Sequence, residues 1–241
     1  MLTPVYDQIA EWYDEQVRTG KLIHDLVVPA LLTAIGRVAG QHICDLACGQ
    51  GVIARQLAQA GAQVVGIDLS TRLLEIARSE EAAAPLDIIY QQEDAQQCQS
   101  LADASFDGVV CNMALMDIAD LSATFRTVYR ILRLRGWFAF SITHPCIQMP
   151  DSAWNRLDDG TIIRESGRYF AEGFWKPGPG PGVRGRIGAH HRTLSTYVNA
   201  LVQAGFSIQS LSEPHASGEL AQRFPSYQSL PAALVVHCLK A

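Results

Sequence analysis

Long apolar runs, an excess of basic charge and a dense set of cysteines are all missing from this 241-residue sequence. No apolar run approaches the roughly 18 residues of a membrane-spanning helix, so we expect no membrane partner. Lysine and arginine number 19 against 24 acidic residues, and the resulting net charge of −5 disfavours a general nucleic-acid binder. Acidic residues at 7, 11, 14 and 15 also disfavour a secretory signal, so we expect a cytoplasmic location.

What is present is the composition of an ordinary globular domain, with 48% hydrophobic and 18% charged residues. A chain of this length buries enough surface to fold without disulfides or a structural metal. Disorder and collagen-like repeats are excluded by the same composition. The six cysteines fall mostly in expected core strands, which is typical of small reduced hydrophobic residues rather than of a disulfide framework.

Short apolar runs alternate with helical patterns through the middle of the chain. The runs at 43–46, 64–67, 109–111 and 138–142 are typical of strands buried on both faces, and a further strand is expected at 86–90. Helical spacing of apolar residues separates them, at 53–58, at 73–77 behind a Ser70 cap, and at 121–132. Strands alternating with helices predict βαβ units and a parallel sheet.

The two ends of the chain have different patterns. Residues 1–39 predict helices, with Pro29 kinking or restarting the second of them. Beyond Thr143 the pattern is lost for about fifty residues, which hold aromatics between 154 and 175 and a Pro/Gly run at 176–182. A loop of this length favours a substrate lid over simple packing. A helix capped by Thr193 and ending at Gly205 follows, and then strands at 206–211 and 233–239.

These patterns divide the chain into four parts. They are an N-terminal helical cap (1–39), a core (40–143), a lid or insertion (144–190), and a C-terminal helix and strand pair that completes the sheet (191–241).

Polar residues follow the expected strands at their carboxyl ends, which is where open parallel sheets bind ligands. They are Asp45, Asp68, Asp94, Asn112 and His144. Gly49 and Gly51 open the first helix after a strand, where free N–H groups and close backbone approach suit a ligand.

Two classes of ligand fit this glycine loop. Gly49, Gly51 and Ala54 match the dinucleotide pattern G-x-G-x-x-A, with Asp68 about 20 residues further on, so an NAD(P)-dependent oxidoreductase is one alternative. A carboxylate at Asp45 would repel a pyrophosphate but attract the sulfonium and ammonium of S-adenosylmethionine. The sequence therefore favours the cationic nucleoside.

The segment ICDLACGQGVIARQLAQAGAQVVGIDLS, followed by Glu93-Asp94-Ala95 and FDGVVCNMALMDIAD, resembles class I S-adenosylmethionine-dependent methyltransferases of the type 11 domain group. The resemblance covers about residues 40–143. It implies an α/β, Rossmann-like three-layer αβα fold with a seven-stranded, mostly parallel sheet whose last strand is antiparallel, and S-adenosylmethionine as cofactor. The opening YDQIAEWYD also resembles the helix that folds over the cofactor in that family.

Site residues carried over by the resemblance are grouped by the part of the cofactor they would meet. They are Asp45, Ala47, Cys48, Gly49 and Gly51 for the methionine moiety, Asp68 and Leu69 for the ribose, Asp94 and Ala95 for the adenine, Asn112 and Met113 for the ammonium, and Tyr6 and Tyr13 on the opening helix. Ala47 departs from the family's usual glycine, which matters if that position needs a positive φ.

Methyl transfer needs alignment and exclusion of water more than a dedicated nucleophile, and a general base only when the acceptor is protonated. The candidate bases are His144, His191 and Tyr13, with His190 and Tyr6 also considered. His144 is as consistent with a strand end, and His190 with the polar start of a helix. These histidines with Cys146 lack the spacing of zinc motifs, so no metal site is predicted.

Together these observations predict a methyltransferase acting on a small, partly aromatic or apolar molecule, as a monomer or homodimer. A catalytically silent adenosyl-binding protein is the remaining alternative, because the cofactor motif alone does not establish turnover.

Overall fold

A single seven-stranded sheet organises the computed structural model, which describes residues 4–20, 22–178, 180 and 182–241. The strand order is β10-β11-β5-β4-β1-β2-β3. The strands β1 to β5 pair in parallel with their neighbours among themselves, and β11 runs antiparallel to both β5 and β10. The strands are β1 (His42–Leu46), β2 (Gln63–Asp68), β3 (Ile89–Gln92), β4 (Phe106–Asn112), β5 (Leu132–Thr143), β10 (Phe206–Ser212) and β11 (Ala233–Lys240). The predicted mostly parallel sheet with an antiparallel last strand is confirmed.

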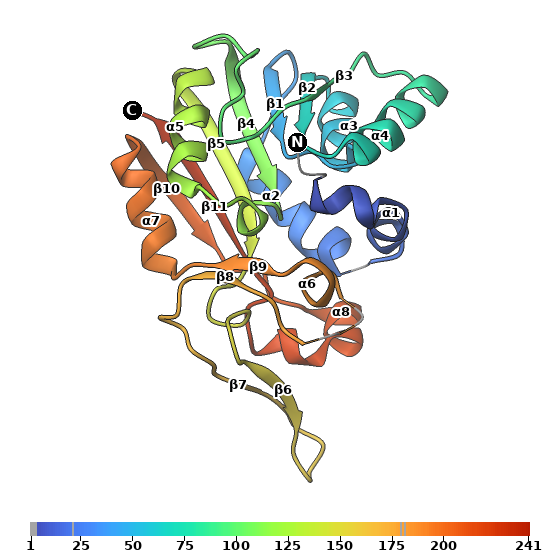
Figure 1. Cartoon of the computed structure of the whole chain (residues 1–241), viewed down its shortest axis with the longest axis vertical. Coiled ribbons are helices and arrows are strands. Elements are labelled where there is room, and N and C mark those ends of the chain that lie inside the picture. The colour runs from blue at the N-terminus through green and yellow to red at the C-terminus, as the bar shows by residue number, and fades with distance from the viewer. Residues whose placement is uncertain (1–3, 21, 179, 181) are drawn as a thin grey trace.

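Helices cover both faces of this sheet (Figure 1). Cys44 faces one core with Phe125 and Leu201, whereas its neighbour Ile43 faces the other core with Leu31. This period of two explains why the strands are continuously apolar. The helices are α1 (Ala10–Thr19), α2 (Val28–Ile35), α3 (Val52–Gln59), α4 (Thr71–Ala83), α5 (Leu121–Ile131), α7 (Leu194–Gln203) and α8 (Gly218–Arg223), with short helical turns η1 (Val5–Gln8), η2 (Ile23–Val27), η3 (Leu115–Asp117) and η4 (Pro225–Gln228).

Helix starts follow side-chain caps that were predicted from the sequence. Ser70 Oγ accepts the N–H of Leu73 at the start of α4, and Thr193 Oγ1 accepts that of Thr196 at the start of α7. Pro29 lies in the first turn of α2, after the π-helical turn η2, so the predicted restart is confirmed. The third strand lies at Ile89–Gln92, a few residues beyond the predicted 86–90.

The expectation of a structureless stretch after Thr143 is wrong. β6 (Ala153–Arg156) and β7 (Ile162–Glu165) form a hairpin that projects from the body, and β8 (Gly173–Trp175) pairs with β9 (Ala189–His191) around α6 (Val183–Ile187) (Figure 1). Every residue of β6 is exposed, so no apolar alternation marks that strand in the sequence. In the Pro/Gly run, residues 179 and 181 lie outside the described residues.

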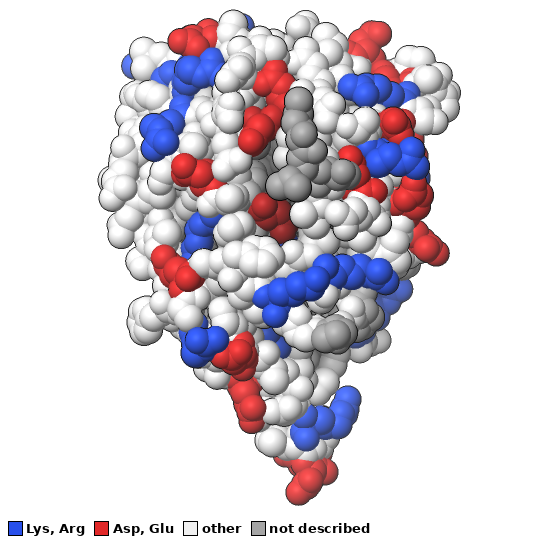
Figure 2. Space-filling model, viewed as in Figure 1, with Lys and Arg blue, Asp and Glu red and all other residues white. Residues whose placement is uncertain are grey.

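Acidic and basic side chains are intermixed on the face shown in Figure 2. In the part of the chain that the structure describes, no helix is long and apolar enough to cross a membrane. All six cysteines are free, and Cys44, Cys98, Cys111 and Cys238 are buried in the core as expected.

Candidate functional site

The sheet brings the predicted site residues to one edge. Asp45 pairs in register with Gly66 of β2 and Val110 of β4, so the carboxyl ends of three neighbouring strands meet beside it. Asp68 ends β2 and Asn112 ends β4, which places both next to the loop after β1. The structure therefore brings Asp45, Asp68 and Asn112 to one edge of the sheet.

The loop from Ala47 to Gly51 is a tight backbone turn. The N–H of Cys48 donates to Ile67 O (2.9 Å), and the N–H of Gly51 donates to Cys48 O (2.9 Å). Gly51 has a φ of 85°, and a Cβ there would lie 2.3 Å from Tyr90 Oη. Glycine is thus required at position 51 both by its conformation and by the tyrosine beneath it.

Ala47 occupies a conformation that favours glycine. Its φ is 56°, in the left-handed region, like the 55° of Gly49 two residues later. The position does need a positive φ, and alanine adopts it at a cost of about 1–2 kcal/mol. The departure from the family's glycine is therefore a source of local strain and does not change the path of the loop.

Asp45 is the most buried acid of the site, with 1% of its surface exposed. The backbone N–H of Ala54 in α3 lies near its carboxylate and favours the charged form, but Oδ2 has no hydrogen-bond partner among the described residues. Burial, reinforced by the nearby charge of Asp68, raises the pKa of Asp45 to about 8. A buried carboxylate with a free oxygen is suited to a cationic ligand.

Asp68 organises the neighbouring strand end. Its Oδ2 accepts the N–H of Gly49 (2.8 Å) and its Oδ1 accepts that of Ser70 (2.8 Å). The hydroxyl of Ser70 donates to Asp7 Oδ1 of the N-terminal segment (2.5 Å). Burial raises the pKa of Asp68. Each carboxylate oxygen keeps a second lone pair, so Asp68 can still accept ligand hydroxyls. Leu69 follows it and is half exposed.

The remaining predicted cofactor residues lie at the ends of β3 and β4. Asp94 Oδ1 accepts the N–H of Gln96 (2.9 Å), so this carboxylate closes its own turn, and Ala95 beside it is buried. Asn112 Oδ1 accepts the hydroxyl of Ser141 (2.7 Å). Met113 has a φ of 54°, and this left-handed turn redirects the chain after β4.

The N-terminal segment reaches the same edge. Tyr6 Oη donates to Asp117 Oδ2 (2.9 Å), and the rings of Tyr6 and Tyr13 pack edge to face with centroids 5.0 Å apart. Arg184 of α6 forms an ion pair with Asp117, and both side chains are largely buried. Burial, followed by the charge of Asp117, raises the pKa of Tyr13 to about 12. At neutral pH the Tyr13 phenol is therefore a hydrogen-bond donor and stays protonated.

The two predicted histidines lie with different sheets: His144 follows β5 of the seven-stranded sheet, and His191 lies on β9, which pairs with β8 in a separate sheet. His144, at the exit of β5, accepts the N–H of Cys146 at Nδ1 (3.2 Å), so Nε2 carries the proton and donates to Glu213 (2.7 Å). Burial lowers the pKa of His144. His191 is buried on β9, with Nε2 2.7 Å from Tyr169 O, which fixes the proton on that nitrogen. Among the described residues, no three metal-ligand side chains gather.

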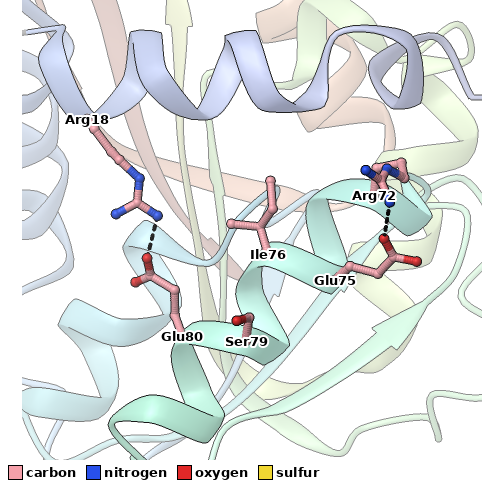
Figure 3. A pocket seen from close by; sticks show the side chains of 6 residues that line it. All are labelled: Arg18, Arg72, Glu75, Ile76, Ser79 and Glu80. Carbon is pink, nitrogen blue, oxygen red and sulfur yellow. Dashed lines mark hydrogen bonds and ion pairs between the residues drawn. The ribbon is translucent and has the colours of Figure 1, made fainter.

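Two pockets lie outside this edge. One of about 340 Å³ lies between α1 and α4, where Arg18 reaches Glu80 and Arg72 reaches Glu75 (Figure 3). The second, of about 300 Å³, lies within the insertion between Pro150 and the segment from Trp175 to Gly178. The first belongs to the contact between the N-terminal cap and the core, and the second belongs to the insertion alone.

Comparison with known proteins identifies the family. A family model described as a methyltransferase domain matches residues 44–140. A crystal structure of an S-adenosylmethionine-dependent methyltransferase from Mesorhizobium loti is 31% identical, with a TM-score of 0.75, over 88% of this chain and 96% of that chain. This chain belongs to the class I S-adenosylmethionine-dependent methyltransferases, and its cofactor is S-adenosylmethionine.

Curated relatives match the core of the chain. The ubiquinone biosynthesis O-methyltransferase of Albidiferax ferrireducens is 35% identical over 106 residues, which are 43% of this chain and 42% of its own length. The protein of the same name from Chromobacterium violaceum is 31% identical over 142 residues, 56% of this chain and 60% of its own length. The chain thus spans about half the length of the curated relatives it matches.

Several residues at this edge were not singled out from the sequence. Asp117 lies inside a quoted motif, five residues after Asn112, but nothing there assigned it a partner. No sequence pattern indicates a role for Arg184, because its contact is with a residue 67 positions away. Buried Arg192 donates to three carbonyls that shape the segment after β4, those of Leu115, Ile118 and Ala119.

Proposed function

We propose that this protein transfers the methyl group of S-adenosylmethionine to a small-molecule acceptor held beneath the insertion. The observation that carries the proposal is Asp45, a buried carboxylate beside a glycine loop with one oxygen that finds no partner in the described part of the chain. A cation bound there would offset the cost of burying this charge. A dinucleotide pyrophosphate would increase that cost, so the same residue opposes the oxidoreductase alternative.

The residues of the edge fit the cofactor. Asp45 and the loop from Ala47 through Cys48 and Gly49 to Gly51 would hold the methionine moiety. Asp68 would accept the ribose hydroxyls on its remaining lone pairs, beside Leu69. Asp94 and Ala95 would meet the adenine, the backbone of Asn112 and Met113 would offer carbonyls to the ammonium, and Tyr6 and Tyr13 would cover the site.

The chain's own contribution to methyl transfer is alignment and exclusion of water. S-adenosylmethionine supplies a methyl carbon made electrophilic by a positive sulfur. The cap and the insertion both reach Asp117, through Tyr6 and Arg184, and from there they would shield a bound cofactor from solvent. No protein nucleophile is needed for a direct displacement.

A general base is needed where the acceptor carries a proton at neutral pH. Tyr13, with its raised pKa, would donate a hydrogen bond to the acceptor. Both ring nitrogens of His144 are engaged by protein groups, so a base role there needs Glu213 or Cys146 to move. Nδ1 of His191 has no hydrogen bond within the described part of the chain, which makes it the proton acceptor we favour.

The acceptor is expected to be small and partly aromatic or apolar. The insertion presents two aromatic side chains to solvent, Phe170 with 88% and Phe174 with 63% of its surface exposed. Exposed aromatics of this kind offer flat apolar contacts to a ring-bearing ligand. The curated relatives are named for O-methylation, and an oxygen acceptor is the first class to screen.

Titration calorimetry with S-adenosylhomocysteine, NAD and NADP tests the cofactor part of this proposal. We expect binding of S-adenosylhomocysteine with a Kd in the micromolar range or below, and no heat from either dinucleotide. Binding of NAD or NADP without S-adenosylhomocysteine would refute it. Turnover is then tested with a library of phenols, carboxylic acids, amines and thiols, because a silent adenosyl-binding protein binds but methylates none of them.

We also propose that the protein acts in the cytoplasm, as a monomer or homodimer, without a nucleic-acid or membrane partner. The net charge of −5 and the intermixed charges on the face shown in Figure 2 favour a protein that does not bind nucleic acid. Light scattering after size exclusion, with and without S-adenosylhomocysteine, measures the oligomeric state.

A further inference from the structure

We propose that Asp117 is a positioning residue that couples closure of the insertion to occupancy of the cofactor edge. This inference rests on the proposed function. It adds to that function a physical connection between the cofactor edge and the insertion. Asp117 lies in η3, just after β4, and is contacted by segments from both ends of the chain. No role in cofactor or acceptor contact is needed for it to act in this way.

The contact to the insertion is a buried ion pair. Arg184 Nη1 donates to Asp117 Oδ1, and the two side chains keep only 13% and 14% of their surface exposed. The same nitrogen donates to Gly188 O at the end of α6 (3.1 Å), which fixes the guanidinium to its own helix. Breaking a buried pair leaves an uncompensated charge, so this contact decides where α6 lies.

The contact to the cap is made by Asp117 Oδ2, which also accepts Arg184 Nη2 (3.4 Å). Tyr6 Oη donates to Asp117 Oδ2, so one carboxylate is shared between η1 and α6. A second contact joins the N-terminal cap to the insertion, because the guanidinium of Arg186 lies 4.1 Å from the ring centroid of Trp12 in α1. Cap and insertion therefore meet at two points over the site.

The residue after Tyr6 faces the cofactor side. Asp7 accepts the hydroxyl of Ser70, whose N–H donates to Asp68, and Asp68 in turn accepts the N–H of Gly49. Adjacent residues of η1 thus contact two networks. One leads through Asp68 to the glycine loop, and the other leads through Asp117 to Arg184.

This arrangement gives a physical route for coupling. A ligand that hydrogen-bonds to Asp68 changes the network that holds Asp7, and η1 carries the change to Tyr6 one residue away. Coupling is reciprocal, so a variant on the insertion side alters cofactor affinity even without touching the cofactor. A residue with only a local structural role would not produce that effect.

Hydrogen exchange of the intact chain, read by mass spectrometry with and without S-adenosylhomocysteine, tests the coupling. In the unmodified protein we expect the ligand to slow exchange in peptides covering both 47–52 and 183–191. In Asp117→Asn we expect protection of 47–52 to remain and protection of 183–191 to be lost, with Kd raised about fivefold or more. Arg184→Gln should behave in the same way, and Arg184→Lys should restore part of the protection.

Arg168→Gln is the matched control, because Arg168 is an insertion arginine whose ion pair with Asp151 is exposed. Its Kd and both protection patterns should stay unchanged.

If Asp117→Asn fails to fold, Tyr6→Phe takes the place of that variant in the experiment, because it removes only one hydroxyl. Protection of 183–191 that persists in the Asp117 variant, or that never appears although the ligand binds, overturns the coupling. Failure of S-adenosylhomocysteine to bind the unmodified protein refutes the proposed function instead.

Discussion

Asp45 illustrates how a side chain suited to ligand binding is costly in the free protein. Its carboxylate is buried, lies near the backbone N–H of Ala54, and has one oxygen without a partner among the described residues. An unpaired buried charge destabilises the folded state and is relieved by protonation or by a cation. The raised pKa of Asp45 shows the first route, and a bound ammonium or sulfonium is the second.

Replacing Asp45 with asparagine should separate these two effects. The substitution keeps the shape of the side chain but removes its charge, so S-adenosylhomocysteine should bind about tenfold to a hundredfold more weakly, as expected for a lost charge-assisted hydrogen bond worth ~1.5–3 kcal/mol. Calorimetric titration at pH 8.5 measures the change.

Because Asp45 is protonated below pH 8, the affinity of the unmodified protein should itself fall as the pH is lowered from 8.5 to 6.5. An affinity that is flat across this range would contradict the role of the carboxylate.

Ala47 offers a test of backbone strain that leaves the site chemistry intact. Ala47→Gly removes the cost of a side chain at φ 56° but adds freedom to the unfolded chain, so we expect a net gain of up to about 1 kcal/mol. This corresponds to a rise in Tm of about 2–4 °C for a chain of this size, measured by scanning calorimetry. Ala47→Val should lower Tm, because a β-branched side chain is more strained at this φ. A lower Tm for the glycine variant would show that Ala47 is unstrained.

The packing of β4 against β5 depends on one glycine. A Cβ at Gly108 would lie 2.1 Å from ring atoms of Trp137, whose Nε1 donates to Gln41 Oε1 (2.8 Å). Gly108→Ala should therefore destabilise the protein by about 1–3 kcal/mol through overpacking. Chemical denaturation measures the loss. Gly182→Ala is the control, since no atom of the described residues lies within 4 Å of its would-be Cβ, and a change of less than about 1 kcal/mol is expected.

The hairpin of β6 and β7 should be separable from cofactor binding. Replacing 153–165 by a short Gly/Ser linker removes the element that projects from the body in Figure 1. It leaves the ion pair between Arg184 and Asp117 in place. We expect turnover of the acceptor to fall at least fivefold, and Kd for S-adenosylhomocysteine to change less than twofold. Turnover assays and calorimetry on one preparation compare the two. A larger loss of cofactor affinity than of turnover would place the hairpin on the cofactor side.

The core elements could be predicted from the sequence because burial imposes a period on them. Strands buried on both faces are continuous apolar runs, and α5 repeats its apolar residues on one side, as at Phe125 and Val128. The insertion could not be predicted in this way. Its strands are three or four residues long, and β6 and β8 are largely exposed, so their pairing depends on backbone hydrogen bonds that leave no mark on composition.

For the site as well, the local motif could be predicted from the sequence and the long-range contacts could not. Asp45, Gly51 and Asp68 lie in a contiguous motif whose local geometry requires those residue types, and the structure brings them together. The meeting of Tyr6, Asp117 and Arg184 joins residues 111 and 67 positions apart. Such contacts depend on how the cap and insertion pack, and no spacing in the sequence encodes that.

For the molecule as a whole, the titration of Asp45 should govern how stability responds to pH. Its folded pKa of about 8 lies above the ordinary value of 3.8, so between these values the folded state holds a proton that the unfolded state has lost. The free energy of unfolding should therefore fall as pH rises from 6.5 to 8. Histidines with lowered pKa values, such as His144, act in the opposite direction only below their ordinary pKa of 6.5.

Denaturation curves at pH 6.5, 7.25 and 8 measure this slope, and Asp45→Asn should flatten it. Saturating S-adenosylhomocysteine should raise Tm by a larger amount at pH 8 than at pH 6.5, because the ionised carboxylate binds it better. A stability that rises with pH in this range, with the asparagine variant showing the same slope, would assign the titration to another group.

The adjacency of Tyr6 and Asp7 has a kinetic consequence. If one turn of chain contacts both the cofactor network and the insertion, the site closes completely only after the nucleotide is seated, and it opens in the reverse order. The two substrates would then bind in a compulsory sequence, with the methyl donor first and S-adenosylhomocysteine released last. Product inhibition by S-adenosylhomocysteine would be competitive against the donor and noncompetitive against the acceptor.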